Sequence, residues 1–198
     1  TIGDSVMFDN GTNVGIGTTS PSQKLDVVGK IALDDGGGSV FIGTDAGLDD
    51  DASSNINVGI GQQALYSNTS GGANVANGAR ALKLNTIGIN NTAIGFGSMY
   101  FNTTGGYNVA IGNQAGTSTN TSAPNETSSN SVYIGSLTKA SASGNTNEIV
   151  IGDTAEGLGS NTVVLGNDSI ITTQLKGNVG IGTTAPSQKL QVNGRIRI

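Results

Sequence analysis

A short pattern recurs along most of the chain: a polar residue, an aliphatic or β-branched residue, a spacer, usually a second aliphatic residue, and Gly. Its copies are separated by 18, 17, 17, 17, 23, 17, 14 and 16 residues and end at Gly43, Gly61, Gly78, Gly95, Gly112, Gly135, Gly152, Gly166 and Gly182. Self-similarity at a nearly fixed period is typical of proteins that stack one structural unit on the next.

Each unit is expected to hold one short strand, a polar turn, a second short apolar step such as Ala64 and Leu65, and a Gly-rich return turn. Asn57, Asn74, Asn91 and Asn108 begin the four central units at the same position. The β-branched residues favour strands. The sequence therefore predicts an all-β fold, a repetitive parallel β-solenoid or β-roll with units of about 17 residues.

The two β-branched residues of a unit, such as Val58 and Ile60, stand two apart and share one face of a strand. We expect this face to be the core. The small spacers are expected to form a second face that presses against sister chains, at Gly59, Ala76, Ala93 and Ala110. A unit of 17 residues has few apolar side chains to offset its ordering entropy, so we expect an intertwined or side-by-side homo-oligomer.

Breaks in the period divide the chain into four parts. Residues 1–38 form an N-terminal bracketing module and turn, and residues 39–130 hold the regular repeats and end in an exposed loop. Residues 131–177 hold less regular repeats with larger spacers, and residues 178–198 form a C-terminal bracketing module. Asn77 replaces an aliphatic residue of the repeat, which suggests an interior hydrogen-bonded ladder or an ion-centred register pin.

Charge and composition narrow the partners. The net charge is −5 and the Lys and Arg residues form no cluster, so nucleic acid is not an expected partner. No apolar run approaches the length of a membrane span, so no membrane insertion is expected. A chain that opens at Thr1 is expected to be a segment of a longer protein.

Candidate catalytic chemistry is restricted because the chain has no His and no Cys. These absences exclude Ser/His/Asp and Cys/His catalysis and His-based metal sites within one chain. A glycosidase-like pair of carboxylates is the remaining device, and it could be drawn from Asp34, Asp35, Asp45, Asp49, Asp50, Asp51, Asp153, Glu156 and Asp168. The alternative is that these are solvated turn residues, and we expect no enzyme.

No cofactor is expected, with Ca²⁺ as the alternative. Residues 48–55 read LDDDASSN and supply carboxylate and amide oxygens, although the spacing matches no EF-hand loop.

Aromatic residues offer the clearest hypothesis for receptor contact. Tyr66, Tyr100, Phe101 and Tyr107 fall at the second apolar step and return turn of neighbouring units. An exposed aromatic row could stack on sugars, whereas the other interpretation places these side chains in the interface between chains.

Two nearly identical segments bracket the repeats: NVGIGTTSPSQKLDVVGKI at residues 13–31 and NVGIGTTAPSQKLQVNGRI at residues 178–196. Their shared string GIGTTxPSQKLxVxG resembles a segment of bacteriophage tail fibres and tail spikes that often precedes an endosialidase-type intramolecular chaperone. Residues 39–115, with NTAIGFGSM and NVAIGNQAG, look more loosely like the head repeats of trimeric autotransporter adhesins. The chain departs from the fibre pattern because no chaperone domain follows before Ile198.

The resemblance implies an extracellular homotrimer in the virion, a structural tail-fibre segment that supports host attachment. The implied partners are sister chains, neighbouring fibre or tail proteins, and a host cell-surface glycan or protein. Two alternatives stay open: the head of a bacterial adhesin or other filament on the bacterial cell surface, and a glycan-cleaving tail spike.

Overall fold

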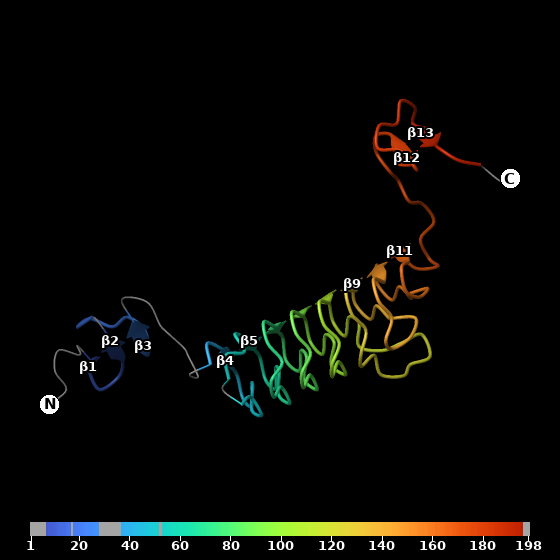
Figure 1. The fold of residues 1–198 in the computed structure, drawn as a ribbon. Coiled ribbons are helices and arrows are strands. Elements are labelled where there is room, and N and C mark those ends of the chain that lie inside the picture. The colour runs from blue at the N-terminus through green and yellow to red at the C-terminus, as the bar shows by residue number, and fades with distance from the viewer. Residues whose placement is uncertain (1–6, 17, 28–36, 52, 196–198) are drawn as a thin grey trace.

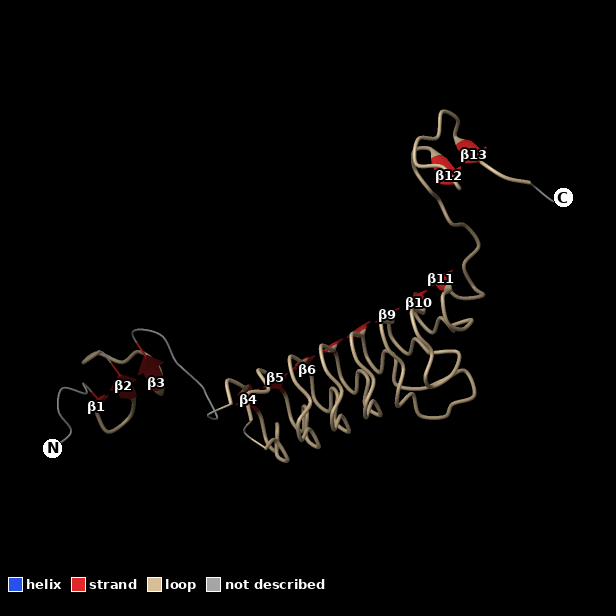
Figure 2. Cartoon of the chain, in the orientation of Figure 1, coloured by secondary structure: helices blue, strands red, loops and turns tan. Residues whose placement is uncertain are grey.

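The computed structural model describes residues 7–16, 18–27, 37–51 and 53–195, and within them it contains strands and turns only (Figure 2). These ranges contain no helix long and apolar enough to cross a membrane. The strands are β1 (Met7–Asp9), β2 (Val14–Ile16), β3 (Leu25–Val27), β4 (Val40–Ile42), β5 (Val58–Ile60), β6 (Val75–Asn77), β7 (Thr92–Ile94), β8 (Val109–Ile111), β9 (Val132–Ile134), β10 (Ile149–Ile151), β11 (Val163–Leu165), β12 (Val179–Ile181) and β13 (Leu190–Val192).

Strands β4 to β11 form one eight-stranded sheet in which each strand pairs in parallel with the next along the chain. Figure 1 shows the intervening segments returning as a row of stacked coils. Equivalent residues of successive units pair, as Val58 does with Val75 and Thr92 with Val109. The expected all-β parallel solenoid with a period of about 17 residues is therefore confirmed. At about 4.8 Å per coil, the sheet extends for about 34 Å.

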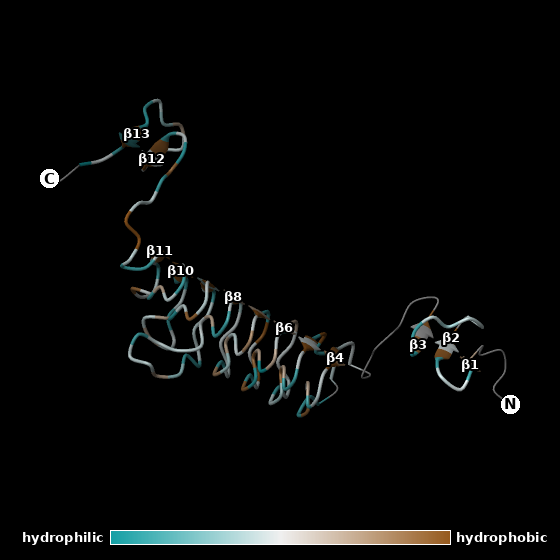
Figure 3. Ribbon diagram, turned by 180° about the vertical axis from the view of Figure 1, so that it is seen from behind, coloured by the Kyte–Doolittle hydropathy of each residue, from teal (hydrophilic) through white to brown (hydrophobic). Residues whose placement is uncertain are grey.

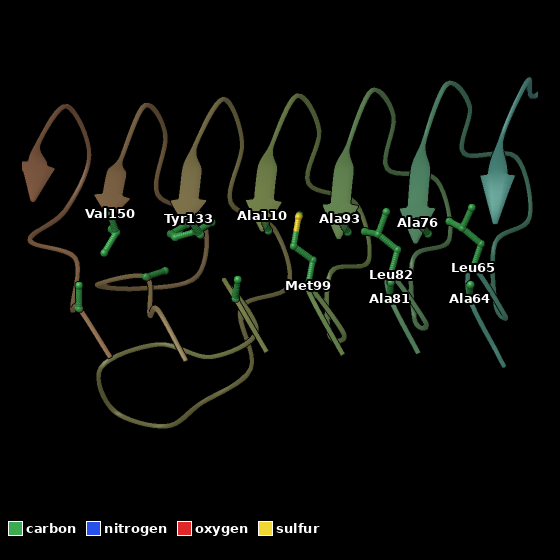
Figure 4. Close-up of a cluster of buried hydrophobic side chains, with 13 residues drawn as sticks. Ala64, Leu65, Ala76, Ala81, Leu82, Ala93, Met99, Ala110, Tyr133 and Val150 are labelled. Atoms are coloured by element: carbon green, nitrogen blue, oxygen red, sulfur yellow. The ribbon is translucent and has the colours of Figure 1, made fainter. Parts of the chain in front are cut away.

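The expected orientation of the strand residues is wrong. The spacers are the interior residues: Gly59 is buried, and Ala76, Ala93 and Ala110 are fully buried. The flanking residues point outward instead, and Ile60 is 37% exposed. The interior of a coil is narrow, and Leu65, Leu82 and Met99 enter it from the opposite side, so only a small residue fits across from them (Figure 4). The small spacers thus reflect packing within one chain.

Two of the large spacers, Phe41 and Tyr133, lie against a Gly of the second apolar step. A Cβ at Gly47 would lie 2.6 Å from the Cδ1 atom of the Phe41 ring. A Cβ at Gly116, in the preceding unit, would lie 2.6 Å from the Cδ2 atom of the buried Tyr133 ring. At these two places the spacer of the strand supplies the bulk that Leu or Met of the second apolar step supplies elsewhere.

The Gly that ends each strand is required by the stacking of coils. In Gly61, Gly78, Gly95 and Gly112 the φ angle lies between 128° and 145°, a region that side chains rarely adopt. A Cβ at Gly95 would also lie 2.6 Å from the carbonyl carbon of Gly112 in the next coil. The recurring Gly thus serves both the turn and the close approach of neighbouring backbones.

Two columns of buried Asn side chains run along the interior. In the first, the Oδ1 atom of each Asn accepts the backbone N–H of the next Asn at 2.9–3.1 Å; its members are Asn57, Asn74, Asn91 and Asn108. In the second, Asn102 Nδ2 donates to Asn85 Oδ1 and Asn85 Nδ2 to Asn68 Oδ1, both at 2.8 Å. These bonds satisfy polar groups that would otherwise be costly inside the coil.

Asn77 belongs to neither column, so the interior ladder considered for it is wrong. It is the last residue of β6. The first and last residues of this strand face outward, and the Asn77 side chain is exposed. Its neighbours in the sheet are Ile60 and Ile94.

The long segment between β8 and β9 does not interrupt the sheet, because these two strands pair directly. The excursion at residues 117–130 is largely exposed, but Thr119, Asn125 and Ser128 are buried within it. Beyond it, Tyr133 and Val150 are the buried spacers.

The bracketing modules have the same local structure. In each, a strand pairs in parallel with the strand 11 residues later, Val14 with Leu25 and Val179 with Leu190. Asn13 Nδ2 donates to the carbonyl of Pro21 at 3.1 Å, and Asn178 Nδ2 donates to that of Pro186 at 2.9 Å. Each module is therefore a single, smaller coil, to which β1 adds an antiparallel strand in the N-terminal copy.

Candidate functional site

A row of outward strand side chains, here called the outer stripe, runs along the solenoid. It comprises the first and last residues of β4 to β11: Val40, Ile42, Val58, Ile60, Val75, Asn77, Thr92, Ile94, Val109, Ile111, Val132, Ile134, Ile149, Ile151, Val163 and Leu165. Fourteen of these are aliphatic and none is charged. Figure 3 shows their strands in one line along an edge of the solenoid.

The outer stripe remains partly exposed in the single chain. Ile94 and Ile111 are each 38% exposed, and at the last strand Val163 reaches 61%. An extended, mostly apolar surface of this kind marks an interaction site more often than isolated exposed side chains do.

Two of the proposed receptor-contact residues belong to one column on another side of the coil. Tyr66 and Tyr100 are separated by two units, and Lys83 occupies the same position in the unit between them. The Lys83 Nζ atom lies 5.5 Å from the centroid of each ring. The column therefore alternates aromatic, cationic and aromatic groups in cation–π geometry.

Phe101 joins this column at its end. Its ring meets that of Tyr100 edge to face, with centroids 4.8 Å apart and an interplanar angle of 71°. Both rings border a hollow of about 300 Å³ whose wall also includes Arg80, Phe96 and Gln114. Aromatic faces beside a guanidinium and an amide can stack on a sugar ring and hydrogen-bond its hydroxyl groups.

Tyr107 lies apart from this hollow. It follows Tyr100 by seven residues, less than half a coil, and precedes the strand β8. Its side chain is 58% exposed, and its backbone has a φ of 60°. The structure thus brings Tyr100 and Phe101 together at one hollow, with Tyr66 in the same column, and separates Tyr107 from them.

In the acidic segment, the side-chain amide of Asn55 contacts two carboxylates. Asn55 Nδ2 donates to Asp50 Oδ2 at 3.3 Å and to Asp51 Oδ1 at 3.2 Å. Hydrogen bonding from Ser53, through its side chain and then its backbone N–H, lowers the pKa of Asp51 below its usual value. Within the described ranges, no three acidic or other metal-ligating side chains are grouped to hold a metal ion.

Two of the remaining candidate carboxylates border a second hollow of about 680 Å³. They are Glu156 and Asp168, and Lys139 lies on the same wall. The Lys139 Nζ atom forms an ion pair with Glu156 Oε1 at 2.8 Å. Asp34 and Asp35 fall outside the residues that the structure describes.

A buried carboxylate that sequence reasoning missed is Glu148, which has 0% exposure. It accepts hydrogen bonds from the Gly159 N–H at 2.8 Å, the Ser141 N–H at 3.2 Å and the Tyr133 hydroxyl at 3.3 Å. Burial, and secondarily the charge of Glu148, raise the pKa of Tyr133 to about 12. The available signal was the EIVIG copy of the repeat, in which Glu148 takes the place of Asn.

The fold defines the chain as a β-solenoid repeat protein. No protein family, curated protein or solved structure matches it.

Proposed function

We propose that the chain is a structural, host-attachment segment of an extracellular bacteriophage tail fibre, built as a homotrimer whose copies pack along the outer stripe. The observation that supports this most strongly is the stripe itself, which runs over eight paired strands without a charge. Burying it between copies would remove apolar surface from water that one chain cannot cover.

A second copy of this chain suits the stripe better than an unrelated partner does. Side chains on the stripe repeat at the strand spacing of about 4.8 Å, so a partner that contacts every rung must repeat at that interval too. The stripe also offers no charge with which an acidic or basic partner could pair. The three-fold symmetry comes from the resemblance to tail fibres and adhesin heads.

The decisive experiment compares two substitutions of the same kind. Ile94→Lys would place a charge in the middle of the outer stripe, whereas Thr104→Lys would place it on an exposed return turn. By sedimentation equilibrium, Ile94→Lys should lower the mass to that of one chain, and Thr104→Lys should retain the assembly. Equal masses for both variants would contradict the proposal.

Host attachment is assigned to the hollow beside Tyr100 and Phe101. A cell-surface polysaccharide of the host should bind there, and Tyr100→Ala or Phe101→Ala should weaken binding about tenfold or more, because each removes a stacking surface. Tyr107→Ala is the matched control because this residue does not line the hollow. Equal binding by all three variants, measured by calorimetry, would place the receptor contact elsewhere.

The same arrangement would serve the head of a bacterial surface adhesin. Antibodies against this chain distinguish the two locations. If the chain belongs to a tail fibre, the antibodies should label the tail of the virion. Labelling of bacterial cells that carry no phage would support the adhesin instead.

A further inference from the structure

We propose that Asn77 and Thr92 set the axial register between copies, so that assembled chains align coil for coil. This inference rests on the proposed packing along the outer stripe and specifies how that interface selects one alignment. The two residues are the only polar members of the stripe, and they lie on adjacent strands, β6 and β7.

The two side chains are diagonal neighbours on the outer stripe, at opposite ends of their three-residue strands, and are together called the polar notch. Asn77 pairs with Ile94 across the two strands, and Thr92 pairs with Val75. Over the part of the chain that the structure describes, neither the Asn77 amide nor the Thr92 hydroxyl has a hydrogen-bond partner. This distinguishes Asn77 from the interior residues Asn85 and Asn91, whose amides donate within the solenoid. The notch is therefore available to another chain.

A repetitive interface needs such a feature because its apolar contacts are nearly degenerate. Sliding one copy by a single coil moves Val and Ile side chains onto equivalent Val and Ile side chains. Most of the apolar burial is kept, and the alignment is weakly specified. Slipped copies would also leave uncovered rungs at both ends, which could recruit further chains into open assemblies.

The notch makes the aligned state distinct. In a closed parallel arrangement, identical residues of all copies lie at the same height, so each Asn77 faces another Asn77. An amide both donates and accepts hydrogen bonds, so identical amides can satisfy one another. After a slip of one coil, Asn77 would face Ile60 or Ile94 and be buried without a partner, which is strongly unfavourable. A single polar residue has this role in coiled coils.

Cysteine pairs can measure the register, because the natural chain has no Cys. Chains carrying Ile111→Cys are mixed with chains that carry Ile94→Cys and a shorter tag, so that the two variants differ in size. The mixture is unfolded and refolded, and disulfides are then formed by mild oxidation. A bond between two copies of Ile111→Cys reports alignment, and a bond between Ile111→Cys and Ile94→Cys reports a slip of one coil. Disulfide geometry tolerates only a short range of Cα separations, so the two products discriminate.

The unaltered notch should give at least about tenfold more aligned than slipped product. Replacing it with the residues of neighbouring units, Asn77→Ile with Thr92→Val, should make the two products comparable while the chain still folds and assembles. Thr104→Val, a similar loss of polarity away from the stripe, should leave the ratio unchanged. An assembled protein whose ratio is the same with and without the notch would overturn the register inference alone. A monomeric unaltered chain would overturn the proposed packing and this inference together.

Discussion

The ring of Tyr133 occupies the space that a side chain at Gly116 would need: a Cβ there would lie 2.6 Å from Tyr133 Cδ2. In the regular coils the corresponding positions carry Ala, as at Ala93, and a larger residue, as at Leu82. The two arrangements fill the same interior by opposite assignments of bulk. This exchange accounts for the change from the small spacer Ala110 to the large spacer Tyr133.

The exchange predicts a strong coupling between the two residues. Tyr133→Ala should lower the free energy of unfolding by about 3–5 kcal/mol through the cavity it leaves, and Gly116→Leu should lower it by overpacking. The double variant should be more stable than the sum of these losses allows, by about 2 kcal/mol or more. Chemical denaturation of the three variants measures this coupling, and strict additivity would show that the residues do not share one space.

The Gly column predicts very different effects at two glycines of one turn. Gly95→Ala should destabilise by more than about 3 kcal/mol, because the new Cβ would collide with Gly112 at a φ of 128°. Gly97 has a φ of 60°, and the nearest atom to a new Cβ is Gln114 Cγ at 3.5 Å. Gly97→Ala should therefore cost only about 1 kcal/mol. Thermal unfolding of the two variants measures the difference in stability. Similar losses of stability for Gly95→Ala and Gly97→Ala would contradict the close stacking of coils.

The inner Asn columns predict that one amide supports several others. Asn85→Ala removes the acceptor of Asn102, the donor to Asn68 and a 3.0 Å bond to the Gly88 carbonyl. A loss of about 2–4 kcal/mol in the free energy of unfolding is expected, because the remaining groups stay buried. Asn113→Ala, at an exposed position, is the control and should change stability by less than about 0.5 kcal/mol.

The raised pKa of Tyr133 predicts a loss of stability at alkaline pH. Below pH 10 both states keep the phenolic proton; between pH 10 and about 12 the unfolded state loses it while the folded state retains it. The free energy of unfolding should thus fall by about 2–3 kcal/mol across this window. The chain has four Tyr and no Trp, so tyrosinate absorbance can follow each ionisation. Tyr133→Phe should remove the ionisation that occurs near pH 12 in the folded protein. If the folded protein showed no tyrosine ionisation above about pH 10, the raised pKa of Tyr133 would be contradicted.

The repeat and its strands could be predicted from the sequence because the recurring Gly has a stereochemical cause. The orientation of the strands could not, because a period of two says that Val58 and Ile60 share a face but not which face is inside. The space inside the coil decided it: a Cβ at Gly59 would lie 2.8 Å from the Cδ1 atom of the Phe41 ring, and Leu65 is also fully buried, so no room remains for Val58 or Ile60.

Part of the candidate site could also be predicted from the period of the repeat. Tyr66 and Tyr100 are two units apart, so their common column follows from the period, and Lys83 falls between them by the same rule. The separation of Tyr107 also follows from its distance of less than half a coil. The hollow beside Tyr100 did not follow, because it depends on how Arg80 of the preceding coil and Phe96 of the same coil pack near the ring.

The mass of the unaltered chain in solution tests the central claim most directly. Light scattering over a wide concentration range should give three times 19.7 kDa if copies bury the outer stripe against one another. A single chain of 19.7 kDa at every concentration, with Val and Ile side chains of the stripe left in water, would contradict it.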